Sequence, residues 1–268
     1  MGGDMVHEKW IETLRTQNRR LKDLKKSPKV VLVHDLPWVR IRDISDQFYC
    51  ELKVDLELKF GKKYAPETKK GSEIHKKVDS SLRRVNLKRL IEDIVSGKSF
   101  FAKFTVDFEF EEVPIVGVLD QTFFREGKPF YLLEVKSTNH KLDRIYEGEK
   151  AQAMLYGFAL EKMGFDCSKL CLAVVKVKRD LDVEKYSNLA VRVVQKMDLI
   201  RDLSKGKVGN KELKNEFVHF WEYNGLEELE GEIREKLNYW TKKRSPKPAQ
   251  NTNKCKRCAY KDFCRGKH

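Results

Sequence analysis

Two charged residues stand on one face of a segment that otherwise has the apolar character of a buried strand. Glu134 and Lys136 are two residues apart within residues 131–136. Successive side chains of a strand point to opposite faces, so these two project together while Leu133 and Val135 project the other way. The pattern predicts a strand that presents a carboxylate and an amine at one common site.

A second carboxylate, that of Asp120, is expected to face Glu134 across a hairpin. Glu126-Gly127-Lys128 has the composition of a turn. A three-residue turn at 126–128 would place Asp120 directly opposite Glu134 on the same face of the sheet. A two-residue turn would break that alignment, so the prediction depends on the length of the turn.

These three residues predict metal-assisted phosphodiester hydrolysis. Adjacent carboxylates repel each other unless a cation lies between them, and their oxygen atoms suit Mg²⁺ or Mn²⁺. Lys136 could hold or deprotonate the attacking water, or stabilise charge on the phosphate, although a lysine of ordinary pKa is too basic to act as a base. The alternative interpretation is a surface salt bridge between Glu134 and Lys136, with Asp120 merely ending a strand.

Other residues strengthen the first interpretation. In chain order, the segments are Gly71-Ser72-Glu73-Ile74-His75, Gly117-Val118-Leu119-Asp120, Glu134-Val135-Lys136 and Gln152-Ala153-Met154-Leu155-Tyr156. Together they resemble the RecB-like branch of the restriction-endonuclease-like, or PD-(D/E)xK, nuclease superfamily. The resemblance implies that Gln152 and Tyr156, which lie one helical turn apart, position DNA or the active-site strand.

The resemblance also implies the fold and the metal site. The expected fold is α/β, with a restriction-endonuclease-like mixed β-sheet core flanked by helices. The metal ligands would be the side chains of His75, Asp120 and Glu134 and the backbone carbonyl of Val135. Lys136 would then assist catalysis.

Three cysteines near the C-terminus have the spacing of a metal site. Cys255, Cys258 and Cys264 form a C-x₂-C-x₅-C pattern, and three thiolates need a fourth ligand to complete a zinc site or a cubane cluster. The spacing does not decide between zinc and iron, and simple unliganded thiols are a further alternative. The other cysteines are the candidates for the fourth ligand: Cys50, Cys167 and Cys171.

One upstream cysteine and a C-terminal triplet on either side of the nuclease motifs resemble the iron–sulfur RecB-like nucleases. These include the CRISPR-associated RecB-like exonucleases, exonuclease V and the nuclease domain of a replication helicase–nuclease. The resemblance implies a four-iron four-sulfur cluster bound by Cys50, Cys255, Cys258 and Cys264, which would join the N- and C-terminal segments. The chain departs from the compact CRISPR-associated members by its N-terminal extension and by a long insert.

Apolar periodicity predicts the elements that position these residues. Helices are expected over residues 1–26, from an N-cap at Ser45 to a stop at Gly61, from Ser72 onward, and over 150–163 before Gly164. Strands are expected over 30–33, 104–110, 115–124, 131–136 and 170–177. The expected organisation is an extension at 1–44, a nuclease core at 45–241 with a mostly helical insert at about 180–240, and a basic linker with the cysteine cluster at 242–268.

Charge and composition favour a polyanionic partner. Lys and Arg number 55 against 41 Asp and Glu in 268 residues, which gives a net charge of +14. A heavily charged, heat-adapted surface is the alternative. With neither a transmembrane segment nor a signal peptide, we expect an intracellular protein without a membrane partner.

The leading hypothesis is an exonuclease that trims single-stranded DNA, in a CRISPR setting beside the integrase that inserts spacers. Two alternatives stay open. One is a non-catalytic DNA-binding module held together by zinc, and the other is a structure- or sequence-specific endonuclease.

Overall fold

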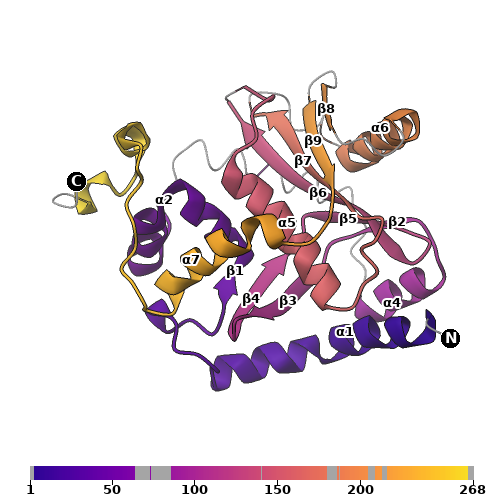
Figure 1. Cartoon of the computed structure of the whole chain (residues 1–268), viewed down its shortest axis with the longest axis horizontal. Coiled ribbons are helices and arrows are strands. Elements are labelled where there is room, and N and C mark those ends of the chain that lie inside the picture. The colour runs from indigo at the N-terminus through magenta and orange to yellow at the C-terminus, as the bar shows by residue number, and fades with distance from the viewer. Residues whose placement is uncertain are drawn as a thin grey trace.

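A mixed sheet runs through the middle of the molecule (Figure 1). The computed structural model describes residues 3–63, 73, 86–139, 141–179, 186, 188–204, 209–212 and 216–264. Within them, the strands of this larger sheet are, in spatial order, β2 (Phe100–Ala102), β5 (Gln121–Arg125), β6 (Lys128–Thr138), β7 (Cys171–Lys178), β9 (Glu216–Glu222) and β8 (Gly209–Glu212). β6 and β7 are parallel and the other neighbouring strands antiparallel.

A smaller sheet adjoins the larger one. It consists of β1 (Val39–Arg40), β4 (Val113–Val118) and β3 (Thr105–Phe110), in that spatial order. β1 is parallel to β4, whereas β3 and β4 form an antiparallel hairpin. The alternating burial of β3 follows its alternating sequence, with Val106, Phe108 and Phe110 buried.

Helices cover both faces of the larger sheet. The helices of the described structure are α1 (Gly3–Lys26), α2 (Ile41–Phe60), α4 (Leu87–Val95), α5 (Glu147–Lys162), α6 (Leu189–Ser204) and α7 (Glu230–Trp240). α5 connects the parallel strands β6 and β7, as a parallel pair requires a crossover. Leu132 and Val174 pack in the cluster on the α5 side, whereas Val135 and Val175 pack in the cluster that contains α6 residues. This double coverage explains why β7 is apolar along most of its length.

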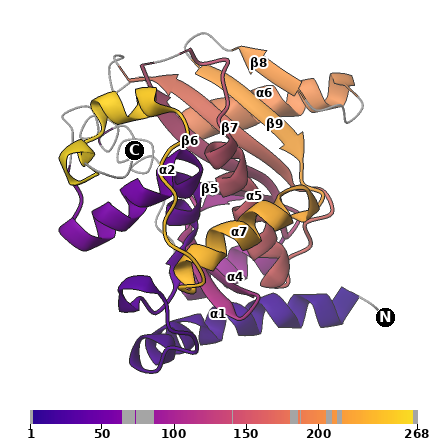
Figure 2. The same ribbon diagram turned by 60° about the vertical axis from the view of Figure 1, so that its left-hand side comes forward.

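The C-terminal segment folds back on α2. The backbone N–H of Leu52 donates a hydrogen bond to the carbonyl of Lys247 at 3.1 Å, and the Tyr260 hydroxyl donates to the carbonyl of Gly61 at 2.6 Å. Figure 2 shows α7 and the C-terminal segment beside α2. α2 and the C-terminal segment thus share one side of the molecule.

The predicted α/β fold with a mixed sheet flanked by helices is confirmed, with local differences. Residues 30–33 do not form a strand; Leu32 is buried but Val31 is 69% exposed. α2 begins at Ile41, and Ser45 lies within it, donating a hydrogen bond to the carbonyl of Gly148 at 2.7 Å. The expected strand 115–124 is divided between the two sheets as β4 and β5.

The expectation of a mostly helical segment at 180–240 missed two strands. α6 and α7 are present, but β8 and β9 lie between them, and β9 pairs along β7 in the larger sheet. β9 buries Val218 and Phe220 within Phe217-Val218-His219-Phe220-Trp221, whose aromatic and β-branched composition favours a strand.

The helix expected from Ser72 lies outside the described residues, apart from Glu73, and His75 is not described. Among the described residues, no helix combines the length and the apolar character needed to cross a membrane.

Candidate active site

Asp120 stands at the bend where the chain passes from the smaller sheet to the larger one. β4 ends at Val118 and β5 begins at Gln121, so Leu119 and Asp120 lie between the two sheets. The Asp120 Oδ2 atom accepts a hydrogen bond from the backbone N–H of Val135 at 3.3 Å. The bend therefore directs the Asp120 carboxylate toward β6.

The turn that closes the β5–β6 hairpin has two residues, not three. Glu126 and Gly127 have φ angles of 53° and 75°, which are the positive values that a type I′ hairpin turn requires. Arg125 pairs directly with Lys128. The expected turn over 126–128 is therefore wrong, and the two-residue turn alone would move Asp120 out of alignment with Glu134.

A β-bulge compensates for the shorter turn. The pairing of β5 with β6 shifts by one residue, which makes Phe130 the extra residue of β6. Beyond the bulge, Gln121 pairs with Leu133, so that Asp120 and Glu134 are the next positions across from each other. The predicted alignment is present, but a bulge rather than the turn length produces it.

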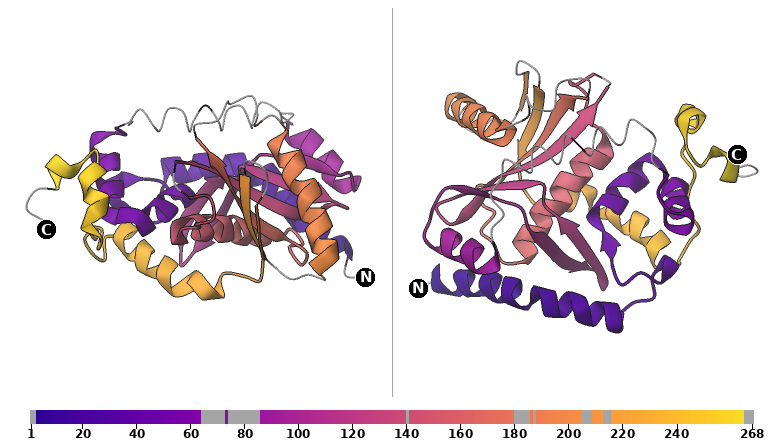
Figure 3. Two further views of the ribbon diagram at one scale, coloured as in Figure 1. Left: turned by 90° about the horizontal axis from the view of Figure 1, so that it is seen from above. Right: turned by 180° about the vertical axis from the view of Figure 1, so that it is seen from behind.

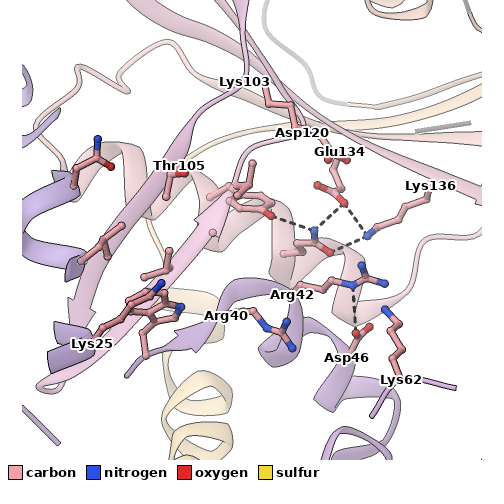
Figure 4. A pocket seen from close by; sticks show the side chains of 18 of the residues that line it. Lys25, Arg40, Arg42, Asp46, Lys62, Lys103, Thr105, Asp120, Glu134 and Lys136 are labelled. Atoms are coloured by element: carbon pink, nitrogen blue, oxygen red, sulfur yellow. Dashed lines mark hydrogen bonds and ion pairs between the residues drawn. The ribbon is translucent and has the colours of Figure 1, made fainter. Parts of the chain in front are cut away.

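Glu134, Lys136 and Gln152 form a closed network (Figure 4). The Lys136 Nζ atom lies 2.7 Å from Glu134 Oε1 and donates to Gln152 Oε1 at 2.8 Å. Gln152 Nε2 donates to the same Glu134 oxygen at 2.8 Å and lies 3.5 Å from the Tyr156 hydroxyl. α5 thus contacts both charged residues of β6 from one side. Gln152 and Tyr156, which the sequence placed at the site, lie next to them.

The electrostatics of the site depend on burial and on the close charges. Glu134 is 2% exposed. Burial, followed by the negative charge of Asp120, raises the pKa of Glu134 to about 7, although Lys136 opposes the shift. Burial acts to lower the pKa of Lys136, but the charges of Glu134 and Asp120 outweigh it and raise that pKa. Lys136 is therefore protonated in this arrangement and acts as a positive charge.

In the described structure, one carboxylate oxygen of the site is free to bind a divalent cation. The Glu134 Oε2 atom is buried and has no hydrogen-bond partner within the described residues, although buried acceptors are nearly always satisfied. An oxygen of this kind beside Asp120 suits Mg²⁺ or Mn²⁺. In the described part of the chain, however, no three His, Cys, Asp or Glu side chains converge on one metal position. The Val135 carbonyl and His75 stay predictions as further ligands.

The network opens into a pocket of about 940 Å³ that we call the basic groove. Its positively charged lining residues outnumber the acidic ones by eight to three. The cations are Lys22, Lys25, Arg40, Arg42, Lys62, Lys103, Lys136 and Arg179, and the acids are Asp46, Asp120 and Glu134. Figure 4 shows Lys25 at one end, Lys136 at the other and Arg40 between them. Such a lining attracts a polyanion.

Most of these cations were not predicted as site residues. A local signal existed for α1, where Lys22 and Lys25 follow each other at helical spacing. Arg40 and Arg42 flank the start of α2, where Arg42 lies 3.6 Å from Asp46. The others come from distant elements that only the fold brings together.

Gly117 forms part of the groove wall where a side chain would not fit. A Cβ atom added there would lie 2.6 Å from Tyr156 Cε1 and 2.7 Å from Ile41 Cδ1. Tyr156 is 4% exposed and belongs to the main core. The close approach of β4 to α5 therefore requires glycine at this position.

The four cysteines expected to bind a cluster lie in one region. Cys50, Cys258 and Cys264 border a small apolar cluster of Leu52, Leu56 and Tyr260. Burial raises the pKa of Tyr49, and the nearby thiols of Cys258, Cys50 and Cys255 raise it further. α2 is kinked at Cys50, whose backbone is extended. As placed, the four thiols do not converge on one metal position in the described structure.

Cys167 and Cys171 are remote from that region. Cys167 is 7% exposed in the main core and Cys171 is 1% exposed in the core that contains α6 residues. Burial also raises the pKa of the Cys167 thiol. Neither residue is placed to replace Cys50 as the fourth ligand.

One comparison with known proteins identifies the family. A family model described as the PD-(D/E)XK nuclease superfamily matches residues 51–265. No curated protein sequence matches the chain. The crystal structure of SSO0001 is similar with 13% sequence identity and a TM-score of 0.44, over 100% of this chain and 98% of that one. A similarity this distant has no bearing on activity.

Proposed function

Because the chain belongs to the PD-(D/E)XK nuclease superfamily, we propose that it is a metal-dependent deoxyribonuclease that cuts at the Asp120–Glu134–Lys136 network. One observation carries the proposal. The bulged hairpin brings Asp120 to Glu134 beside a protonated Lys136, and it leaves a buried Glu134 oxygen without a partner in the described structure. A buried carboxylate, a half-buried one and a cation that line a basic groove suit a phosphodiester and not a neutral substrate.

Each residue then has a distinct role. Asp120 and Glu134 would hold Mg²⁺ or Mn²⁺, with the Val135 carbonyl and His75 as the further ligands that the resemblance implies. The metal, when bound, activates water and polarises the phosphate. Lys136 would stabilise the negative charge that develops on the phosphate, because its amine lies at the same site, 2.7 Å from Glu134. Gln152 and Tyr156 would orient the two β6 residues.

We also propose a substrate, a mode of cutting and a role for the cysteines. The basic groove supports binding of DNA, and the family resemblance supports an exonuclease that acts on single-stranded ends, in a CRISPR setting before integration. The thiols of Cys50, Cys255, Cys258 and Cys264 would hold a four-iron four-sulfur cluster, with zinc as the alternative. The location of three of these residues around one cluster of side chains supports a shared site.

A cutting assay tests the catalytic assignment. Labelled linear single-stranded, linear double-stranded and closed circular DNA are incubated with the protein in Mg²⁺, in Mn²⁺ or in EDTA. Asp120→Ala should lower the rate more than about a hundredfold, since even residues that only support metal ligands contribute about 10- to 100-fold. Glu232→Ala, which removes an exposed acid on α7, should cut as the wild type does.

Several outcomes would change the proposal. Undiminished cutting by Asp120→Ala would refute the site. DNA binding without cutting of any substrate would indicate the non-catalytic module. Cutting of closed circular DNA would show an endonuclease.

A further inference from the structure

The N-terminal helix α1 forms one wall of the basic groove, although it lies outside the residues that match the nuclease family. Asn18, Lys22 and Lys25 line the groove and occupy successive turns of one helical face. All three side chains are exposed. Figures 1 and 3 show α1 along one edge of the molecule, beside the smaller sheet.

Specific contacts fix which face of α1 meets the groove. Trp10 and Leu14 are buried in the main core. Gln17 donates to Asp107 of β3 at 2.6 Å, and Arg20 lies 2.7 Å from the same carboxylate. One face of α1 is thus buried in the core, and the face beside it is held by Asp107. The face that bears Lys22 and Lys25 is turned toward the groove.

An aromatic residue stands at this end of the groove. Trp38, just before β1, lines the groove, and Lys25 Nζ lies 5.3 Å from the centre of its ring. Trp38 is half-buried, and it is accompanied in the groove by Val118, which is 49% exposed. A partly exposed indole beside Lys25, in a groove that Lys22 also lines, offers a surface for stacking a base next to charges for its phosphates.

We propose that α1 and Trp38 form a binding subsite for single-stranded DNA, in which Trp38 stacks on an unpaired base and Lys22 and Lys25 contact the adjoining phosphates. The strand would then pass along the groove to Asp120 and Glu134. Stacking selects an unpaired base, because a base within a duplex has both faces covered. The inference rests on the proposed nuclease function for the direction of the strand, but the binding itself can be measured without cutting.

The test measures binding in EDTA, which prevents metal-dependent cutting. The fluorescence anisotropy of a labelled dT oligonucleotide and of a blunt duplex is recorded for the full-length protein. Trp38→Leu should weaken binding of the dT oligonucleotide about tenfold, in line with the loss of one stacked base, and change duplex binding little. Trp38→Phe should retain most of the affinity. Thermal unfolding of each variant shows whether it is folded.

The contribution of Lys22 and Lys25 is tested by substitution, with two other cations of α1 as the control. Lys22→Ala/Lys25→Ala should lower the slope of log affinity against log salt concentration by about 1.4, the value for two single-strand phosphate contacts. Arg19→Ala/Lys26→Ala removes the same charge from exposed positions of α1 that do not line the groove. It should leave that slope nearly unchanged. Equal effects of the two double variants would reduce the subsite to general electrostatic attraction and overturn the proposal.

Tryptophan fluorescence provides an independent readout. Of the other three tryptophans, Trp10 and Trp240 are buried, at 2% and 0% exposed, and Trp221 is partly buried on β9 and does not line the groove. Trp38 should therefore supply most of the quenching when the dT oligonucleotide binds. Quenching and affinity that persist in Trp38→Leu would overturn the inference. Failure of the wild type to cut DNA, together with Trp38-dependent binding, would instead remove the nuclease proposal and leave the subsite.

Discussion

At the scale of single residues, the site depends on how Glu134 shares its hydrogen bonds with its neighbours. Glu134 Oε1 accepts from both Lys136 and Gln152, while its other oxygen faces a position without a partner in the described structure. Tyr156 packs on the far side of Gln152 and against Gly117. The spacing of these groups thus depends on a glycine that carries no chemistry of its own.

We predict that Gly117→Ala disturbs this spacing. The new Cβ would lie under 3 Å from the Tyr156 ring and from Ile41, so the protein should lose about 1–3 kcal/mol of unfolding free energy through overpacking. Its nuclease activity should fall as Tyr156 and Gln152 move. Gly231→Ala is the control, because nothing lies within 4 Å of a Cβ there, and alanine in helix α7 should stabilise by about 0.5–1 kcal/mol. Urea unfolding measures both, and equal stability of the two variants would contradict the prediction.

At the scale of elements, an ion pair holds the start of α5 against the larger sheet. Lys176 of β7 is 1% exposed, and its Nζ lies 2.5 Å and 2.7 Å from the two carboxylate oxygens of Glu149 in the first turn of α5. Lys176 pairs across the ladder with Lys136. Since Gln152 follows Glu149 by one turn, this pair helps to set the position of Gln152 over the site.

Breaking this pair should therefore be costly. We expect Lys176→Met to lower the free energy of unfolding by about 3–5 kcal/mol, because it leaves Glu149 without its buried partner. The double variant with Glu149→Met should be less unstable than the sum of the single variants. Lys88→Met is the control, since the Lys88–Glu92 pair is 4.0 Å apart with Lys88 88% exposed and should contribute under about 1 kcal/mol. Additive effects of Lys176→Met and Glu149→Met in urea unfolding would contradict the prediction.

At the scale of the whole molecule, two segments distant in sequence complete the nuclease core. α1 contributes Trp10 and Leu14 to the main core, and the C-terminal segment returns to α2 near Cys50. The groove then lies between α1, the smaller sheet and the start of α2. α1 thus shapes the basic groove, and the C-terminal segment shapes the cysteine region.

Metal analysis tests the cysteine region. If the four thiols hold a metal centre, Cys258→Ser and Cys50→Ser should each lose the bound metal and lower the melting temperature, because the metal links segments far apart in the chain. Cys171→Ala, in a separate core, should retain the metal. Iron with visible absorption would support the cluster, and zinc alone would support the alternative. Equal metal content in all three variants would contradict the assignment of Cys50 and Cys258.

The sequence by itself predicted the residues of the candidate site and determined the class of the fold. Alternation along a strand depends on neighbouring residues only, so Glu134 and Lys136 could be assigned to one face without knowledge of the rest. Helical spacing likewise placed Gln152 and Tyr156 on one side of α5. Apolar runs predicted most of the elements, although the strand β9 was missed within a segment expected to be helical.

Only the tertiary structure decided how distant segments combine. The two-residue turn would have misaligned Asp120, and the compensating bulge at Phe130 depends on how β5 and β6 pair along their whole length. Cys50, and not Cys167 or Cys171, lies near the C-terminal triplet because α2 and the last segment pack together. The cations of the groove are spread along the sequence from Lys22 to Arg179. No local pattern contains such information, because it arises from the packing of helices and sheets against one another.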